Sequence, residues 1–223
     1  MKQLELIELV QQHHPHMGHT EIRKALNRAQ NDYCARTELI KETYVQNSIA
    51  GHRYYNLNDN ILKILSIQIN DVEIPRLQGN PIIDDDEFDG SEGLTAGSSS
   101  SNDRYWYVNN GRLALVEKAT NAITRDGKTS DYQSISEVKE VRIYAISQGT
   151  DFGDDLEQES DLPLQFREGL SYKVISDGYA VGGGMNIEAH KLFFTKYKDA
   201  ISEGRKFARS NYISVGNIVQ THF

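Results

Sequence analysis

A cluster of histidines near the start of the chain is the first candidate for chemistry. Four of the seven histidines fall within seven residues: His13, His14, His16 and His19. Neutral imidazole binds zinc, copper and nickel, so the cluster could be a metal site. Pro15 and Gly18 prevent a helical pair of ligands spaced by four residues, and no matching group of cysteines or acids follows. We interpret the segment as an exposed loop between helices, with a metal-binding protein or a metal-dependent enzyme as the alternative function.

Three other patterns resemble chemical sites but fit structural roles better. The acids from Asp84 to Asp86 could bind calcium, yet they lack the alternate spacing and the glycine of an EF-hand loop. The glycines from Gly182 to Gly184 follow a helical pattern and precede no Gly-Lys-Ser/Thr, so they do not match a phosphate-binding loop. Cys34 lies in a helical stretch and is expected to be a packed side chain. No catalytic set stands out by spacing, so we predict no enzyme activity, no cofactor and no bound metal.

Length and composition predict a globular chain with unevenly distributed charge. The 223 residues are 38% hydrophobic and 25% charged, and the formal net charge is −8. No apolar run approaches the ~20 residues that cross a bilayer, and acids within the first apolar run argue against a signal peptide. The single cysteine excludes an internal disulfide and suits a reducing cytosol. Residues 84–103 contain seven acids and residues 151–161 contain six, without Lys or Arg, which predicts two solvated loops.

The longest helical pattern runs from Leu162 to Arg209 and predicts two helices joined by a glycine turn. Phe166, Leu170 and Val174 recur every four residues, which is the spacing of one apolar face. Asn186 is a suitable N-cap for the second helix. The second helix has an apolar stripe of its own: Phe193, Tyr197, Ile201, Gly204 and Ala208. Two such helices with a short connection should pack antiparallel.

Helical patterns also occupy the first 43 residues. Residues 2–12 predict a short helix, and a second helix is expected from an N-cap at Thr20 to about Lys41. Its apolar residues recur at spacings of three and four: Ile22, Leu26, Ala29, Tyr33, Thr37 and Ile40. We therefore expect helices at both ends of the chain.

The segment from residue 44 to residue 160 has the alternation of strands. Asn110-Gly111 between two apolar runs is the sequence signal of a type I′ hairpin. A two-residue loop would pair residues that share one face: Val108 with Leu113, and Trp106 with Leu115. Asp126-Gly127 marks a second hairpin, and Val138–Ile146 reads as a further strand.

The order of helices, strands and helices predicts an α+β fold. Residues 1–43 and 161–209 are expected to form a helical bundle. Residues 44–160 would be an inserted small antiparallel β domain, with acidic mobile loops at 84–103 and 147–160.

The last segment, residues 210–223, lacks Lys, Arg, Asp and Glu. It contains six large apolar residues: Tyr212, Ile213, Val215, Ile218, Val219 and Phe223. These residue types favour an extended backbone, and their apolar surface is costly to leave in water. We predict an extended C-terminal tail that binds another molecule.

Two regions of the sequence resemble the head–tail connector proteins of tailed bacteriophages, also called adaptor or neck proteins, particularly those of short-tailed phages. The resemblance covers residues 1–75 and 160–210. It lies in the order of elements and the apolar spacing of five segments: LIELVQQ, IRKALNRAQNDY, GHRYYNLNDNILKILSIQI, DLPLQFREGL and AHKLFFTKYKDAISEGRKFAR.

The resemblance implies a structural role in the virion. Copies would form a ring, expected to be a dodecamer, beneath the portal protein and above the tail or nozzle proteins. DNA would pass through the channel without specific binding, which acidic loops would favour. The chain would be made in the host bacterial cytoplasm and would contact no membrane. The resemblance also implies that the six apolar tail residues bind the portal.

Overall fold

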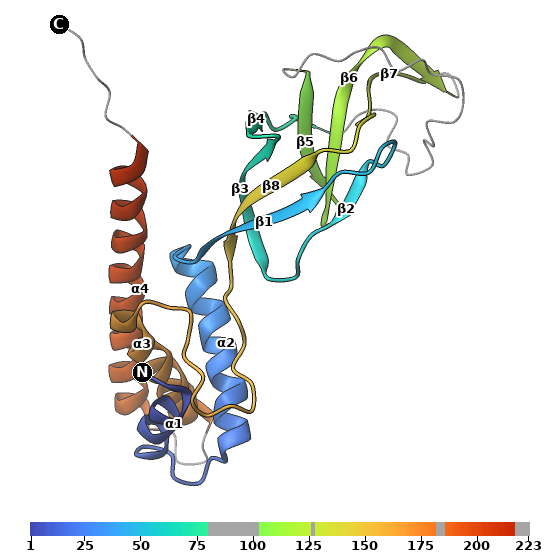
Figure 1. Ribbon diagram of the computed structural model, residues 1–223. Helices are drawn as coiled ribbons and strands as arrows, with labels where there is room; N and C mark the ends of the chain where they lie inside the picture. Colours follow the sequence, from blue (N-terminus) through green and yellow to red (C-terminus); the bar gives the residue numbers. More distant parts are fainter. Residues whose placement is uncertain (80–102, 126–127, 182–185, 217–223) are drawn as a thin grey trace, which may run out of the picture. The chain divides into compact units, whose positions relative to one another are not determined.

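The computed structural model describes most of the chain: residues 1–79, 103–125, 128–181 and 186–216. The chain divides into a helical unit, made of Met1–Lys41 and Ile146–Phe223, and a β unit, made of Glu42–Ala145 (Figure 1). Helices and antiparallel strands therefore occupy separate parts of the sequence, and the α+β prediction is confirmed.

The helical unit brings together helices from the two ends of the chain. Its described helices are α1 (Gln3–Gln11), α2 (His19–Thr37), α3 (Leu164–Val181) and α4 (Ile187–Gly216). The hydroxyl of Ser176 near the end of α3 lies 3.0 Å from Nδ1 of His190 near the start of α4. Phe166 at the start of α3 contacts Phe207, with ring centroids 5.4 Å apart. The two helices are therefore antiparallel, as predicted.

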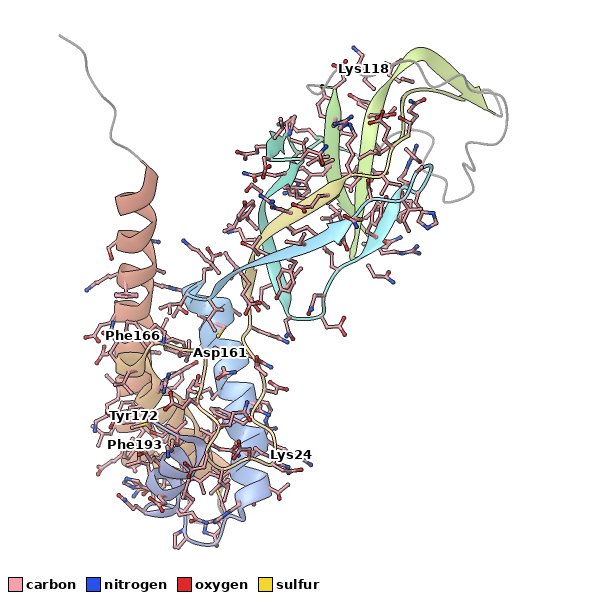
Figure 2. All side chains as sticks on the ribbon, in the orientation of Figure 1. Lys24, Lys118, Asp161, Phe166, Tyr172 and Phe193 are labelled. Carbon is pink, nitrogen blue, oxygen red and sulfur yellow. The ribbon has the colours of Figure 1, made fainter. Side chains whose placement is uncertain are left out.

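One apolar core fills the helical unit. The predicted stripes supply it, because Leu170, Ile22 and Leu26 are completely buried and Tyr197 is almost completely buried. Side chains of α3 and α4 lie together in Figure 2, where Phe166, Tyr172 and Phe193 are labelled. The buried apolar residues of this core come from all four helices, from the residues after α2 and from the segment before α3: Leu6, Ile7, Val10, Ile22, Leu26, Ala29, Tyr33, Cys34, Ile40, Phe152, Leu162, Phe166, Leu170, Val174, Ile175, Phe193, Tyr197 and Ile201.

The predicted N-cap of α4 is correct, whereas both ends of α2 differ from the prediction. The amide of Ala189 donates a hydrogen bond of 3.0 Å to Oδ1 of Asn186, so Asn186 caps α4. Helix α2 begins one residue before Thr20, with Gly18 in the N-cap position. It ends at Thr37, because Glu38 adopts a left-handed conformation with φ of 53°.

The prediction that residues 147–160 form a mobile loop of the β domain is wrong. The clustering of contacts places them in the helical unit, where they are fixed along α2. Phe152 is buried in the core, and its backbone exchanges hydrogen bonds with the Asn27 side chain at 2.9 and 3.2 Å. The side chain of Gln30 donates to the carbonyl of Thr150 at 2.8 Å. The acidic composition of the segment could not predict this order, because the order comes from the burial of Phe152 and from hydrogen bonds with the side chains of Asn27 and Gln30.

The β unit contains two sheets over a shared core. Its strands are β1 (Lys41–Asn47), β2 (Tyr54–Asn56), β3 (Ile61–Ile69), β4 (Val72–Ile74), β5 (Arg104–Asn109), β6 (Arg112–Arg125), β7 (Lys128–Ser134) and β8 (Glu140–Ser147). One sheet has the order β1-β8-β3-β4, and the other has the order β2-β6-β5 with β7 also paired to β6. The chain after β4 joins the sheets, because Leu77 donates its amide to the carbonyl of Trp106 at 2.7 Å. The core takes side chains from both sheets, among them Ile67, Leu115 and Val141.

The Asn110-Gly111 hairpin has the predicted register. Both turn residues have positive φ, which is the requirement of a type I′ turn. The strand partners are those predicted: Val108 with Leu113, and Trp106 with Leu115. Trp106 and both leucines are buried, whereas Val108 is 37% exposed. The second predicted hairpin is confirmed by the pairing of β6 with β7, although residues 126 and 127 lie outside the described residues.

The prediction of an extended tail from residue 210 is wrong for residues 210–216. Helix α4 continues through them to Gly216, and residues 217–223 lie outside the described residues. A helix that is already formed adds each further residue at little cost, because nucleation is the unfavourable step. The weak strand preference of Tyr, Ile and Val is therefore overridden until a glycine is reached.

Candidate functional site

The end of α4 carries half of the residues that were predicted to bind a partner. Tyr212, Ile213 and Val215 lie on its last turns, and the other three lie outside the described residues: Ile218, Val219 and Phe223. Phe207 packs against Phe166, which is the third residue of α3. Because the helices are antiparallel, the turns of α4 after Phe207 extend past the start of α3. Figure 1 shows this end of α4 continuing beyond the other helices of its unit.

The histidine cluster has a packing role that the sequence did not reveal. His14 is buried, and its Nε2 lies 2.9 Å from the carbonyl oxygen of Ile175. A Cβ on Gly178 would lie 2.4 Å from the same nitrogen, so this glycine makes room for the ring. Nδ1 of His13 lies 3.2 Å from the hydroxyl of Tyr179. The predicted loop does join α1 and α2. The prediction that it is exposed is wrong for His14, which is buried.

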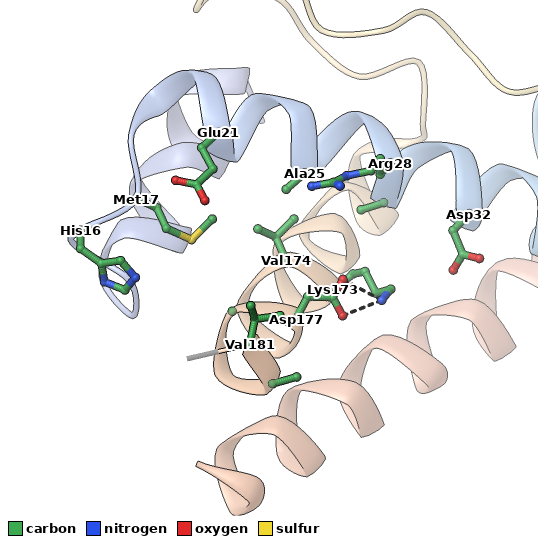
Figure 3. Close-up of a pocket in the computed structure, with 13 residues that line it drawn as sticks. His16, Met17, Glu21, Ala25, Arg28, Asp32, Lys173, Val174, Asp177 and Val181 are labelled. Carbon is green, nitrogen blue, oxygen red and sulfur yellow. Dashed lines mark hydrogen bonds and ion pairs between the residues drawn. The ribbon is translucent and has the colours of Figure 1, made fainter. Parts of the chain in front are cut away.

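An open groove of about 880 Å³ lies between α2 and α3 (Figure 3). Small and apolar side chains line it together with charged ones: Met17, Ala25, Val174, Val181, Glu21, Arg28, Lys173 and Asp177. Lys173 and Asp177 form an ion pair of 2.6 Å, one turn apart on α3. Asp32, also in the lining, accepts hydrogen bonds of 2.8 Å from Arg36 and from the Tyr197 hydroxyl. Several charges of the groove are thus already paired, and the lining offers packing area rather than acid–base chemistry.

Two titratable side chains in the core of the helical unit, Tyr197 and Cys34, stay in their neutral forms. Burial, and then the hydrogen bond to Asp32, raises the pKa of Tyr197 far above its ordinary value. Burial likewise raises the pKa of Cys34 to about 12, so its thiol remains protonated at neutral pH. Cys34 is fully buried, which confirms the prediction that it is a packed side chain.

One side of α4 carries a row of cations that the sequence reasoning missed. Its members are spaced by seven, seven and four residues: Lys191, Lys198, Arg205 and Arg209. At 3.6 residues per turn these spacings place them on one flank of the helix, beside the buried stripe. All four are exposed. We call them the basic flank. The signal is the spacing of Lys and Arg along the sequence of α4.

The segment from Asp151 to Glu159 gives the helical unit a surface of the opposite charge, and we call it the acidic segment. It has five exposed acids: Asp151, Asp154, Asp155, Glu157 and Glu159. Three of them pair with cations of the helices or the chain start: Asp154 with Arg23, Glu157 with Lys2, and Glu159 with Arg167. The hydrogen bond from Arg167 is the main cause that lowers the pKa of Glu159. These contacts fix a run of acids on the outside of α1, α2 and the first turn of α3.

Among the described residues, no group of three or more His, Cys, Asp and Glu side chains is arranged to hold a metal ion. Within the same residues, no helix has the length and apolar character required to cross a membrane.

No model of a protein family matches the chain, and no curated protein matches it either.

Proposed function

We propose that this protein is a ring-forming head–tail adaptor of a tailed bacteriophage, located between the portal and the tail. The observation that carries the proposal is the division of the chain. Helices from both ends share one core, and the β unit is inserted between Lys41 and Ile146. This arrangement is the one implied by the resemblance to phage neck proteins. A helical bundle from the two chain ends would form the body of each ring subunit.

The end of α4 is the proposed contact with the portal. It extends past α3 and carries Tyr212, Ile213 and Val215, and the last three apolar residues of the chain follow it. Because the described part of this contact is helical, we propose a helix that docks in a groove rather than an extended tail. Aromatic anchors such as Tyr212 and Phe223 would supply much of the affinity, because they bury large areas.

The mass of the purified full chain, alone and with portal rings, tests the proposal. Mass photometry should show a discrete assembly of many copies, expected to be twelve, at least when portal rings are present. Rotational symmetry predicts one closed size rather than a ladder of sizes. A chain that remains monomeric and does not bind portal rings at micromolar concentration would count against the adaptor role.

Two truncated chains separate the parts of the proposed portal contact. A chain that ends at Ser210 should fold, with an unchanged helical signal from the core, but should not co-purify with portal rings. A chain that ends at Gly216 keeps the last turns of α4 and serves as the matched control. Retained binding by both truncated chains would exclude the portal role of the six apolar residues. Loss of binding in both would assign the contact to residues 217–223.

A further inference from the structure

We propose that neighbouring copies of this chain bind through unlike surfaces of the helical unit, the basic flank of one copy against the acidic segment of the next. This inference rests on the proposed function, since a ring requires a repeated contact between copies. It adds the two surfaces that would make the contact.

The basic flank is available for such a contact. Among the described residues, none of its four cations forms an ion pair, and the Arg205 guanidinium only donates to the carbonyl of Arg36 at 2.8 Å. The Nζ atom of Lys198 lies 4.6 Å from the centroid of the Phe194 ring, and this contact directs the charge of Lys198 along the helix surface. From Lys191 to Arg209 the row spans about 27 Å at 1.5 Å per residue. Ile187, one turn before Lys191, is 53% exposed and adds an apolar end to the same flank.

The acidic segment is complementary in charge and is held in place. Asp151 and Asp155 are exposed, and no cation of the described residues pairs with either of them. The carboxylate of Asp155 accepts a hydrogen bond of 2.9 Å from the amide of Glu157, which orients it without neutralising it. Leu156 between them is 36% exposed. An ordered acidic surface with an apolar side chain at its centre can bind a basic flank with an apolar end at a small entropic cost.

The positions of the two surfaces favour a second copy over another partner. The acidic segment bonds to the start of the chain and α1, to α2 through Arg23 and Asn27, and to the first turn of α3 through Arg167. Among the described residues, no hydrogen bond or ion pair joins the acidic segment to α4, so the two surfaces do not satisfy each other within a chain. A contact between unlike surfaces of identical copies repeats from copy to copy and closes into a ring when the rotation permits. The net charge of −8 disfavours the other obvious ligand of a basic row, the phosphate backbone of DNA.

Charge reversal on each surface tests the contact. Lys198→Glu and Asp155→Lys each place like charges opposite one another, so each should weaken self-association by at least about tenfold in sedimentation velocity at low salt. An equimolar mixture of the two variants should assemble again, because alternating copies restore opposite charges at every contact. Lys196→Glu, a reversal on the opposite side of α4, is the matched control and should assemble like the unmodified chain. Circular dichroism of each variant confirms that the fold is kept.

Four results would overturn the contact. If Lys198→Glu and Asp155→Lys assemble normally, the contact is excluded while the adaptor role is untouched. If each variant fails to assemble and the mixture fails as well, the two residues do not face each other. If Lys198→Glu abolishes binding of a duplex DNA probe and leaves self-association unchanged, the basic flank is a nucleic-acid surface instead. An unmodified chain that never associates, alone or with portal rings, would overturn both the contact and the proposed function.

Discussion

The contacts that stabilise the helical unit join residues far apart in the sequence, whereas many of those in the β unit join neighbouring segments. In the helical unit, polar groups near the start of the chain bond to groups near its end. The Tyr33 hydroxyl donates to the carbonyl of Ala200, and the Tyr197 hydroxyl donates to Asp32. In the β unit, hairpins pair β3 with β4, β5 with β6 and β6 with β7, which are neighbours along the chain. The stability of the helical unit therefore depends on how well segments from the two ends of the chain pack together. The stability of much of the β unit depends on the turns between neighbouring strands.

This difference predicts which changes damage each unit. Long-range contacts between helices offset a large loop-closure entropy, and their side chains must fit closely. Hairpins close short loops, so their stability depends more on whether the turn residues accept positive φ. Substitutions in the two units should therefore differ in kind as well as in size.

Loss of core volume in the helical unit should have the largest effect. Leu170 on α3 is completely buried, so Leu170→Ala should lower the free energy of unfolding by about 2–5 kcal/mol. Chemical denaturation followed by circular dichroism measures this change. Leu192→Ala is the matched control, because Leu192 is 56% exposed on α4 and should change stability little. Equal denaturation midpoints for the two variants would contradict the burial of the α3 stripe.

Crowding of a helix contact should have the next largest effect. A Cβ on Gly204 would lie 2.5 Å from the Tyr33 hydroxyl oxygen and 2.9 Å from Cγ2 of Thr37. Gly204→Ala should therefore lower stability by about 1–3 kcal/mol, despite the better helix propensity of alanine. At Gly153 the nearest atom to an added Cβ is 3.6 Å away, so Gly153→Ala serves as the control. If thermal unfolding shows Gly204→Ala to be neutral or stabilising, the close contact of α2 with α4 is not present.

A turn substitution should affect the β unit through the backbone alone. Gly111 has φ of +76° and no atom within 4 Å of an added Cβ. Gly111→Ala should therefore cost about 1 kcal/mol from strain and not from packing. Gly18→Ala, also at an open position but with φ of −75°, is the control, because any cost of replacing this glycine N-cap falls on α2 and should leave the exchange of β5 and β6 amides unchanged. Hydrogen exchange of β5 and β6 amides locates the loss, and protection that is unchanged in Gly111→Ala would contradict the turn geometry.

The smallest effect concerns the ion pair that fixes the acidic segment to α3. The pKa of Glu159 is lowered from 4.5 chiefly by its hydrogen bond with Arg167, so its contribution to stability is present above pH 4.5. That contribution is lost as the pH falls through the lowered pKa. Glu159→Gln should therefore be slightly less stable than the unmodified chain at pH 7, and the difference should shrink toward zero in acid. Thermal unfolding from pH 7 to pH 3 measures it, and a difference that grows in acid would contradict the assignment.

The periodicity of apolar residues was sufficient to predict most helices and strands, but not all of the contacts that their side chains make. The α3 and α4 stripes and the Asn110-Gly111 register follow from spacing alone, because 3.6-residue and two-residue repeats each determine a face. The burial of His14 could not be predicted, since it requires a glycine 164 positions later, at Gly178, to make room for the ring. Residues 147–160 were misjudged for the same reason. Their order comes from Asn27 and Gln30 on a distant helix.

The candidate surfaces show the same limit. The end of α4 was predicted as a binding segment from its composition, but its helical form depends on the long helix that precedes it. The basic flank could have been found from the spacing of Lys191, Lys198, Arg205 and Arg209. Its significance required the structure, because only the fold shows that the acidic segment lies on other helices of the same unit.

A reconstruction of the intact virion neck tests the central claim most directly. We predict density for this chain as a closed ring between the portal and the tail, with the ends of α4 in contact with portal subunits. In that ring the basic flank of each copy should face the acidic segment of its neighbour. Density for this chain at any other position in the particle, or its absence from purified virions, would contradict the account.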